Sequence, residues 1–266
     1  ECVDYLRTQG KKVGVITVHL YRPFSAKYLF NVLPKSVKRV CVLDRTKEPG
    51  ANGEPLFLDI RDAFYECENR PMVIGGRYGL SSKDTTPAQM LAVFANLEAD
   101  EPKNHFTVGI NDDVTMLSLP VGKEISMAKE GTYEALFFGL GSDGTVGANK
   151  NSIKIIGGST NKYCQAYFSY DSKKSGGYTS SHLRFGDNPI TSPYLVTTPD
   201  FVACHVPSYV DKYDVLKGLK RGGSFLLNSV NDAETTCRTL PAHMKAYLAK
   251  NNINFYIINA TKIAAE

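Results

Sequence analysis

A regular alternation of short apolar runs with amphipathic segments constrains the fold more than any other feature of the sequence. Residues 13–18 form an apolar, β-branched run typical of a buried strand, and a segment with helical spacing follows, with Ser25 as its expected N-cap. A second strand is expected to end at Asp44. After a third strand, a helix is expected to begin at Thr86 and Pro87. Strands that alternate with helices predict an α/β fold with a parallel sheet and crossover helices.

This alternation stops and then resumes, which predicts three regions along the chain. Residues 1–98 are assigned to a first α/β unit. Residues 99–130 break the pattern, and we expect residues 104–110 and 114–120 to pair there as a β-hairpin at a junction. Residues 131–266 are assigned to a second α/β unit.

Further elements are expected within this second unit. Residues 177–190 are predicted to be a loop with an edge segment, and residues 211–223 a helix closed by glycine. A later helix is expected at residues 240–252 with Asn251 near its end, and a strand that leads into a helix is expected to follow.

The composition excludes several classes of protein. Residues 131–266 carry the whole formal net charge of +4 without clustered basic runs, which argues against a nucleic-acid-binding surface. No apolar run reaches the roughly 18 residues of a membrane span, and no signal peptide is recognised at the start. The 6 cysteines have no C-x-x-C spacing, so a metal or iron–sulfur site is not expected in this chain. Reduced thiols in a cytoplasmic protein are the prediction.

The motif with the clearest chemistry is a glycine-rich turn in the second unit. Gly139, Gly141 and Gly144 follow the G-x-G-x-x-G pattern, with an expected strand at residues 134–140 before it and a helix after it. A helix that begins at such a turn presents unpaired N–H groups and a positive dipole, which suit a phosphate group. Asp143 within the turn would repel a phosphate, so we expect its carboxylate to bond the turn backbone or cap the helix.

The next strand bears on which nucleotide is bound. Asp171 comes 27 residues after Gly144, later than the acidic residue that binds the ribose in NAD-binding units. Lys173 and Lys174 follow it and suit a phosphorylated ribose, which NADP and coenzyme A both have. The residues leave these two ligands open, and a purely structural turn with solvated lysines also remains an alternative.

Longer motifs resemble a known family. The segments "GLGSDGTVGANKNSIKIIG" and "YFSYDSKKSGGYTSSHLRFG" are similar to the coenzyme A-binding domain of pyruvate:ferredoxin (flavodoxin) oxidoreductases. The segment "GVITVHLYRPFSAKYLFNVLPKSVKRVCVLD" resembles the preceding domain of those enzymes, which is related to the transketolase C-terminal domain. The resemblance implies two Rossmann-like units, both truncated. It also implies that coenzyme A is bound by Gly141, Ser142, Asp143, Gly144, Thr145 and Lys173.

The same resemblance implies the role of the parent enzyme. Such an enzyme oxidises pyruvate on thiamine diphosphate, passes electrons through [4Fe–4S] clusters to ferredoxin or flavodoxin, and forms acetyl-CoA and CO2. The thiamine motif and cluster cysteines are not found in this sequence, so the chain alone is expected to be inactive, with no catalytic residue and an incomplete coenzyme A site. The other domains of the parent are expected partners, and a homodimer is expected for the parent. The exact 2-oxoacid and the electron acceptor stay open.

Two other classes of function remain as alternatives. One is an NADP-dependent dehydrogenase, for which no convincing catalytic set is found, and the other is a non-catalytic scaffold. Further polar residues are interpreted as structural. Adjacent Cys204 and His205 should point to opposite faces of a strand, which argues against a nucleophile and its base. His182 with Arg184, and His19 with Arg22, are more consistent with packing than with a site.

Overall fold

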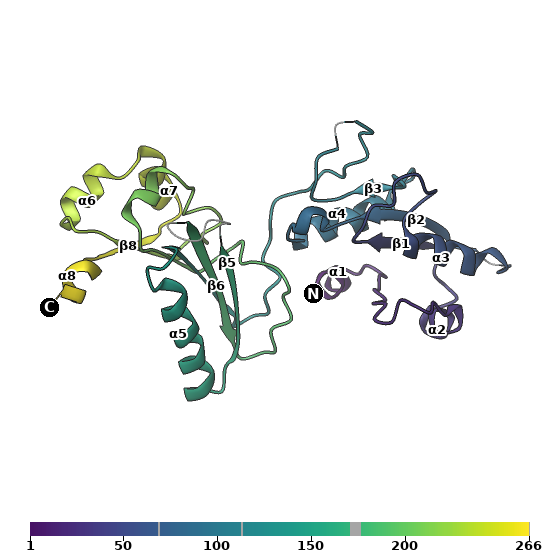
Figure 1. Cartoon of the computed structure of the whole chain (residues 1–266), viewed down its shortest axis with the longest axis horizontal. Coiled ribbons are helices and arrows are strands. Elements are labelled where there is room, and N and C mark those ends of the chain that lie inside the picture. The colour runs from purple at the N-terminus through teal and green to yellow at the C-terminus, as the bar shows by residue number, and fades with distance from the viewer. Residues whose placement is uncertain (69, 113, 171–176, 266) are drawn as a thin grey trace. The chain divides into compact units, whose positions relative to one another are not determined.

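The computed structural model describes residues 1–68, 70–112, 114–170 and 177–265. By its internal contacts the chain divides into two compact units, Glu1–Met127 and Ala128–Glu266 (Figure 1). Each unit contains its own β-sheet, and the strands in both are mostly parallel. The α/β fold class is therefore confirmed.

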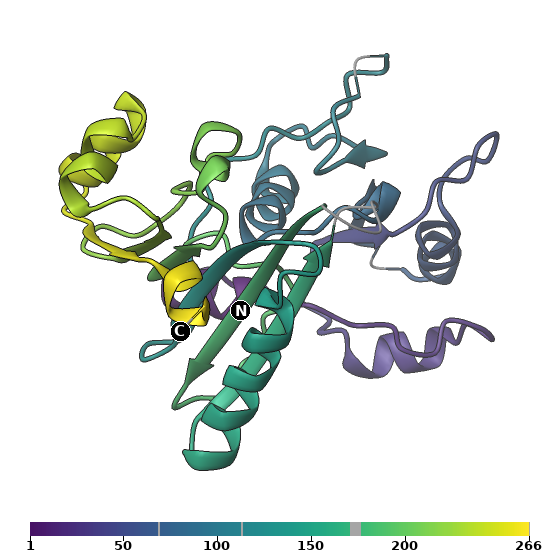
Figure 2. The same ribbon diagram turned by 60° about the vertical axis from the view of Figure 1, so that its left-hand side comes forward.

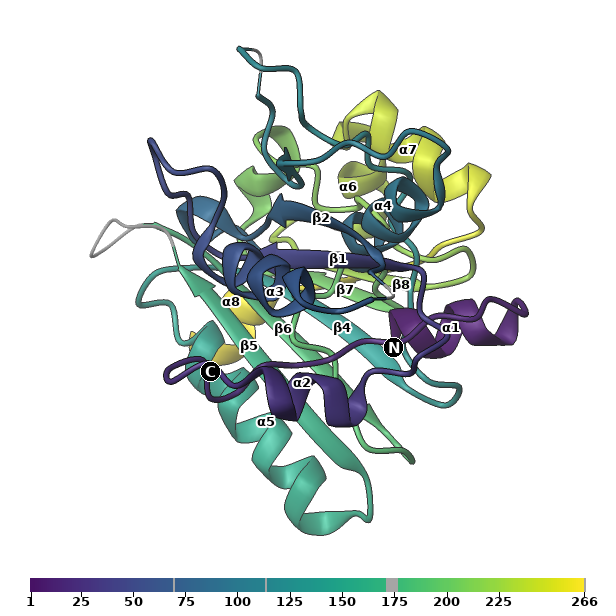
Figure 3. The same ribbon diagram turned by 90° about the vertical axis from the view of Figure 1, so that its right-hand side faces the viewer.

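The first unit is built around a three-stranded parallel sheet in the order β1-β2-β3. Alternate residues of β1 belong to two different apolar clusters. Val42 packs with Phe57 of α3, whereas Cys41 and Leu43 pack against the cluster that contains Val93 of α4. The two helices thus cover opposite faces of the sheet (Figure 3). The elements of this unit are α1 (Cys2–Thr8), α2 (Ala26–Val32), β1 (Arg39–Asp44), α3 (Pro55–Tyr65), β2 (Met72–Arg77), η1 (Leu80–Ser82), α4 (Pro87–Glu98) and β3 (Phe106–Thr107).

The strand predicted at residues 13–18 is not formed, which makes that prediction wrong. These residues have no regular structure, and Val15 is 73% exposed. An apolar β-branched run indicates a preference for burial, but a strand also needs a neighbour that completes its hydrogen bonds, and the sheet ends at β1. The helix expected after it does begin next to Ser25, and the later helix begins at Pro87 after Thr86.

The segment expected as a β-hairpin contains β3 and an isolated parallel bridge between Thr107 and Ser118. Strand β3 pairs with β2 and so belongs to the sheet of the first unit. The division into residues 1–98, 99–130 and 131–266 remains a prediction.

The second unit contains a six-stranded mixed sheet in the order β5-β6-β4-β7-β8-β9. Helix α5 runs along one face of this sheet, beside β5 and β6 (Figure 2). The other face holds a large apolar cluster that includes Leu136 and Phe138 of β4 and Met244 of α7. The elements are β4 (Tyr133–Leu140), α5 (Thr145–Ser159), β5 (Tyr163–Tyr170), β6 (Tyr178–Gly186), β7 (Phe201–Cys204), η2 (Pro207–Asp211), β8 (Ser224–Asn228), α6 (Ala233–Thr239), α7 (Ala242–Lys250), β9 (Asn254–Ile258) and α8 (Ala260–Ala265).

Two expectations for this unit were wrong. Residues 177–190 are not a loop with an edge segment, because they contain β6, an interior strand antiparallel to both β4 and β5. Polar residues make this strand hard to recognise in the sequence, yet they are buried there, and some are hydrogen-bonded, as in the contact of Ser180 with His182 and of Arg184 with Glu134. The helix predicted at residues 211–223 is not formed, because Asp211 ends the 3₁₀ helix η2 and residues 212–223 contain only turns and irregular structure. The predicted helix ending near Asn251 is confirmed by α7, whose C-cap is that residue.

Candidate functional site

The glycine-rich turn connects β4 to α5, as the sequence predicted. Gly144 is the N-cap of α5 and has a φ of 86°, a left-handed conformation that a side chain would strain. Ser142 also has a positive φ, 73°, which is uncommon for a residue with a Cβ. The turn therefore directs the chain sharply from the end of a strand into the first turn of a helix.

The side chain of Asp143 accepts hydrogen bonds from both ends of this turn. One carboxylate oxygen accepts a hydrogen bond from the N–H of Leu140 at 2.7 Å, and the other accepts one from the N–H of Thr145 at 2.8 Å. The expectation that Asp143 bonds the turn backbone is confirmed. Its negative charge is thus directed at backbone N–H groups of the turn.

Several other N–H groups of the turn are available to a ligand. Within the described part of the chain, no hydrogen bond satisfies the backbone N–H of Gly144, Val146 or Gly147. The helix dipole adds partial positive charge at the same place, and α5 is 15 residues long. An anion is the natural partner of such a group of donors.

A pocket of about 340 Å³ opens beside these donors. It lies within the second unit, between the glycine-rich turn and the facing ends of β5 and β6. Tyr170 and Tyr178 are among its lining residues, and burial raises the pKa of Tyr178 to about 12. The lining residues are Leu140, Gly141, Ser142, Asp143, Gly144, Val146, Gly147, Tyr170, Gly177, Tyr178 and Thr179.

The structure brings together four of the six residues predicted to bind the ligand, and these four line the pocket: Gly141, Ser142, Asp143 and Gly144. Thr145 does not line it, and its side chain is buried in contact with His205. Lys173 lies outside the described residues, between Tyr170 and Gly177 of the pocket in the sequence.

His205 is a neighbour of the turn that sequence reasoning did not assign to the site. Its Nδ1 lies 2.8 Å from the hydroxyl oxygen of Thr145. Burial lowers the pKa of this imidazole, and the nearby carboxylate of Asp143 acts in the opposite direction. The signal in the sequence was its position just after β7, because β7 is parallel to β4 and the carboxyl ends of parallel strands meet at one edge of the sheet.

Cys204 and His205 have different surroundings, as expected for adjacent residues at the end of a strand. The Cys204 thiol is buried and donates to the carbonyl of Val206 at 3.2 Å, and burial raises its pKa to about 11. A neutral buried thiol is a poor nucleophile. Its interpretation as a structural residue agrees with this environment.

His182 and Arg184 also have structural environments. His182 accepts from the N–H of Val196 at 3.1 Å and bonds Ser180, and burial lowers its pKa to about 4 with a further contribution from Arg184. Arg184 is 1% exposed and donates to Glu134 at 2.9 Å. Both side chains therefore make structural contacts within the sheet.

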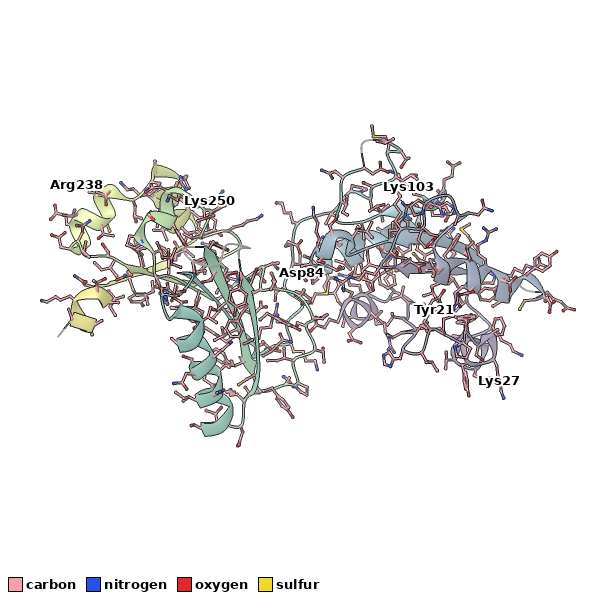
Figure 4. The ribbon with its side chains drawn as sticks, viewed as in Figure 1. Tyr21, Lys27, Asp84, Lys103, Arg238 and Lys250 are labelled. Atoms are coloured by element: carbon pink, nitrogen blue, oxygen red, sulfur yellow. The ribbon has the colours of Figure 1, made fainter. Side chains whose placement is uncertain are left out.

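Tyr21 and Arg22, which follow the apolar run of residues 13–18, contact Asp59 of α3. Tyr21 donates to Asp59 at 2.7 Å, and Arg22 pairs with the same carboxylate at 2.6 Å. Tyr21 is labelled in Figure 4, which places it in the first unit near α2. In the same view the labelled Arg238 and Lys250 lie near α6 and α7, above the sheet of the second unit, whereas α5 runs below it.

A membrane span or a metal site would require particular features of the described residues. None of the helices described has both the length and the apolar character needed to cross a membrane. Within the same residues, no three His, Cys, Asp or Glu side chains gather as metal ligands would.

Comparison with known proteins assigns the chain to a family. A family model described as pyruvate ferredoxin/flavodoxin oxidoreductase matches residues 134–266, and one described as pyruvate:ferredoxin oxidoreductase core domain II matches residues 1–90. The chain belongs to the pyruvate ferredoxin/flavodoxin oxidoreductase family. The first match contains the whole pocket, and the second covers most of the three-stranded sheet unit.

Individual relatives of this oxidoreductase family are similar along the full chain. It is 58% identical over 265 residues to a pyruvate-flavodoxin oxidoreductase from Enterobacter agglomerans, covering 99% of this chain and 23% of that protein. It is 57% identical over 266 residues to a pyruvate:ferredoxin oxidoreductase from Moorella thermoacetica, covering 100% and 23%. The chain thus spans about a quarter of the length of these relatives.

A search of solved structures also matches part of this chain to two oxoacid oxidoreductases. A pyruvate oxidoreductase subunit from Thermotoga maritima matches 51% of this chain and 66% of its own, with 23% identity and a TM-score of 0.39. A 2-oxoglutarate:ferredoxin oxidoreductase from Magnetococcus marinus, solved with 2-oxoglutarate, coenzyme A and succinyl-CoA bound, matches 52% of this chain and 21% of its own, with 12% identity and a TM-score of 0.39.

Proposed function

We propose that the chain is part of a thiamine-diphosphate-dependent pyruvate oxidoreductase and supplies part of its coenzyme A site. The whole enzyme would convert pyruvate and coenzyme A to acetyl-CoA and CO2 in the cytoplasm, as a homodimer, and would reduce ferredoxin or flavodoxin. Thiamine diphosphate and [4Fe–4S] clusters, held by other domains, would supply the decarboxylation and electron transfer. Family membership and the names of the full-length relatives support this proposal.

The observation that carries the coenzyme A assignment is the pocket beside the glycine-rich turn. The N–H groups of Gly144, Val146 and Gly147, which have no partner among the described residues, suit the pyrophosphate, because several donors and the helix dipole converge there. Tyr170 and Tyr178 line the pocket, and an aromatic ring there would offer apolar surface to an adenine base. The side chain of Asp143 bonds the turn itself, so the turn presents donors rather than a free carboxylate.

Each predicted residue has a separate role in this proposal. Gly141 and Gly144 allow close backbone approach, and Ser142 adds a hydroxyl at the pocket wall. Thr145 would support the turn through its contact with His205. Lys173, assigned from the resemblance, would pair with the 3′-phosphate of the ribose, because an ammonium group binds phosphate as a point charge.

Titration calorimetry of the full-length protein that carries this sequence tests the ligand. We expect coenzyme A to bind and NADP not to bind. Removal of the 3′-phosphate, in dephospho-coenzyme A, should weaken binding by roughly tenfold or more, since a charge-assisted contact contributes about 1.5–3 kcal/mol. Lys173→Ala should weaken coenzyme A to a similar extent and should leave dephospho-coenzyme A almost unchanged.

Lys162→Ala is the matched control, because Lys162 pairs with Asp187 on the surface of the same unit. Equal affinity for coenzyme A and its dephospho form would refute the assignment of Lys173. Absence of coenzyme A binding would refute the proposed site. Binding of NADP instead would favour the dehydrogenase alternative.

A further inference from the structure

His205 is fixed on both sides of its own backbone by neighbouring strands. Its N–H donates to the carbonyl of Phe138 in β4 at 2.9 Å, and its carbonyl accepts from the side-chain amide of Asn228 in β8 at 3.1 Å. The imidazole therefore starts from a rigid edge of the sheet. From there Nδ1 reaches the hydroxyl of Thr145 at 2.8 Å.

Thr145 is the first residue of α5 and joins three parts of the turn. Its N–H donates to Asp143 at 2.8 Å, its side chain packs where Gly139 leaves room, and its hydroxyl meets His205. The residue is only 4% exposed, so its hydroxyl has little access to water. Loss of the imidazole would leave a buried hydroxyl unsatisfied, which is unfavourable.

We propose that His205 is a positioning residue for coenzyme A, which acts through Thr145 and does not touch the ligand. Thr145 lies directly before Val146 and Gly147, which line the pocket and whose N–H groups have no hydrogen-bond partner among the described residues. A small rotation of the first turn of α5 would misdirect these donors, because hydrogen bonds weaken steeply as their angle departs from linear. The inference rests on the proposed coenzyme A site and adds a residue that lies outside the glycine-rich turn.

The test uses steady-state kinetics of the full-length enzyme with three variants: His205→Ala, His205→Asn and Thr145→Val. The asparagine amide places a polar atom near the position of Nδ1, so this variant should retain most of the contact. We expect His205→Ala to raise the KM for coenzyme A by roughly five- to tenfold, the loss expected for one buried hydrogen bond. The kcat at saturating coenzyme A and the KM for pyruvate should change less than about twofold, since the lost contact acts on ligand binding.

A double variant separates a shared contact from two independent effects. If His205 acts through Thr145, His205→Ala combined with Thr145→Val should be no worse than the more affected single variant. His243→Ala is the control, because it removes an exposed imidazole from α7 in the same unit. Thr145→Val keeps the shape of the side chain and remains informative if His205→Ala does not fold.

The outcomes that overturn the inference are distinct from those that overturn the proposed function. An unchanged KM for coenzyme A in His205→Ala and Thr145→Val, with saturable wild-type activity, refutes the positioning role alone. Equal effects on kcat and on both KM values, without rescue by His205→Asn, would also refute it, because they indicate a general loss of structure. A wild-type enzyme that does not bind coenzyme A would refute the proposed function as well.

Discussion

Asp143 holds the glycine-rich turn in place, because its two carboxylate oxygens bond N–H groups on either side of it. Asp143→Ala removes both acceptors and leaves these N–H groups without their partner. We expect the free energy of unfolding to fall by about 1–2 kcal/mol, as when a helix cap is removed. Urea denaturation of the wild-type chain and the variant measures this difference.

Two further variants make the Asp143 result interpretable. Asp143→Asn keeps one carbonyl acceptor and should have intermediate stability. Asp187→Ala is the surface control, because Asp187 pairs with exposed Lys162 and such a pair contributes at most about 1 kcal/mol. If Asp143→Ala were as stable as the wild type, the carboxylate would not support the turn.

At the scale of single residues, the sequence predicted local contacts better than distant ones. The bonds of Asp143 span three positions or fewer, and the place of this carboxylate within a turn that suits a phosphate was enough to expect them. The contact of Thr145 with His205 joins residues 60 positions apart, which only the order of the strands brings together. Residue types alone therefore did not reveal it.

The connection between β4 and α5 depends on the absence of a side chain at Gly139. A Cβ there would lie 2.6 Å from Cβ of Thr145 and 2.9 Å from a carboxylate oxygen of Asp143. Gly139→Ala must therefore push the start of α5 away from the strand. We expect it to lower the free energy of unfolding by about 1–3 kcal/mol, as overpacking does, which thermal or urea denaturation can measure.

Gly158→Ala provides the control within the same helix. A Cβ at Gly158 meets no atom of the described residues within 4 Å, and alanine has the higher helix propensity. This variant should therefore be as stable as the wild type or more stable by up to about 1 kcal/mol. Equal effects of the two substitutions would contradict the steric role of Gly139.

At the scale of elements, apolar patterning predicted most strands and helices. It failed where buried residues are polar and where an apolar run forms no strand. Strand β6 was missed because its buried residues include Ser181, His182 and Arg184, which are polar. Residues 13–18 have the opposite character, because they are apolar but form no strand. Whether such a segment forms a strand depends on hydrogen bonds to partners that are distant in the sequence. The periodicity of side chains carries no information about these bonds.

At the scale of the whole molecule, the two units have separate sheets and separate apolar clusters. The candidate site lies in the second unit, so the stability of that unit limits the conditions under which the site exists. The buried polar side chains of its sheet include His182, an imidazole whose ordinary pKa of 6.5 lies close to neutral pH.

His182 should make the second unit less stable in mild acid. Its pKa is lowered to about 4 by burial and by Arg184, against an ordinary value of 6.5. As the pH falls below 6.5 the unfolded chain binds a proton that the folded chain does not, so the folded state loses stability until about pH 4. The full loss is about 3 kcal/mol, of which about 2 kcal/mol should appear between pH 7.5 and pH 5.

Comparison of pH profiles isolates this contribution from other titrating groups. Urea denaturation of the wild-type chain and of His182→Asn, at pH 7.5 and pH 5, gives the change in unfolding free energy for each. We expect the wild type to lose about 2 kcal/mol more than the variant over this range, although the variant is less stable at pH 7.5 because it alters a buried site. His243→Asn, on the exposed face of α7, should follow the wild-type profile. The same pH dependence in His182→Asn and in the wild type would show that His182 does not limit the acid stability of the unit that carries the site.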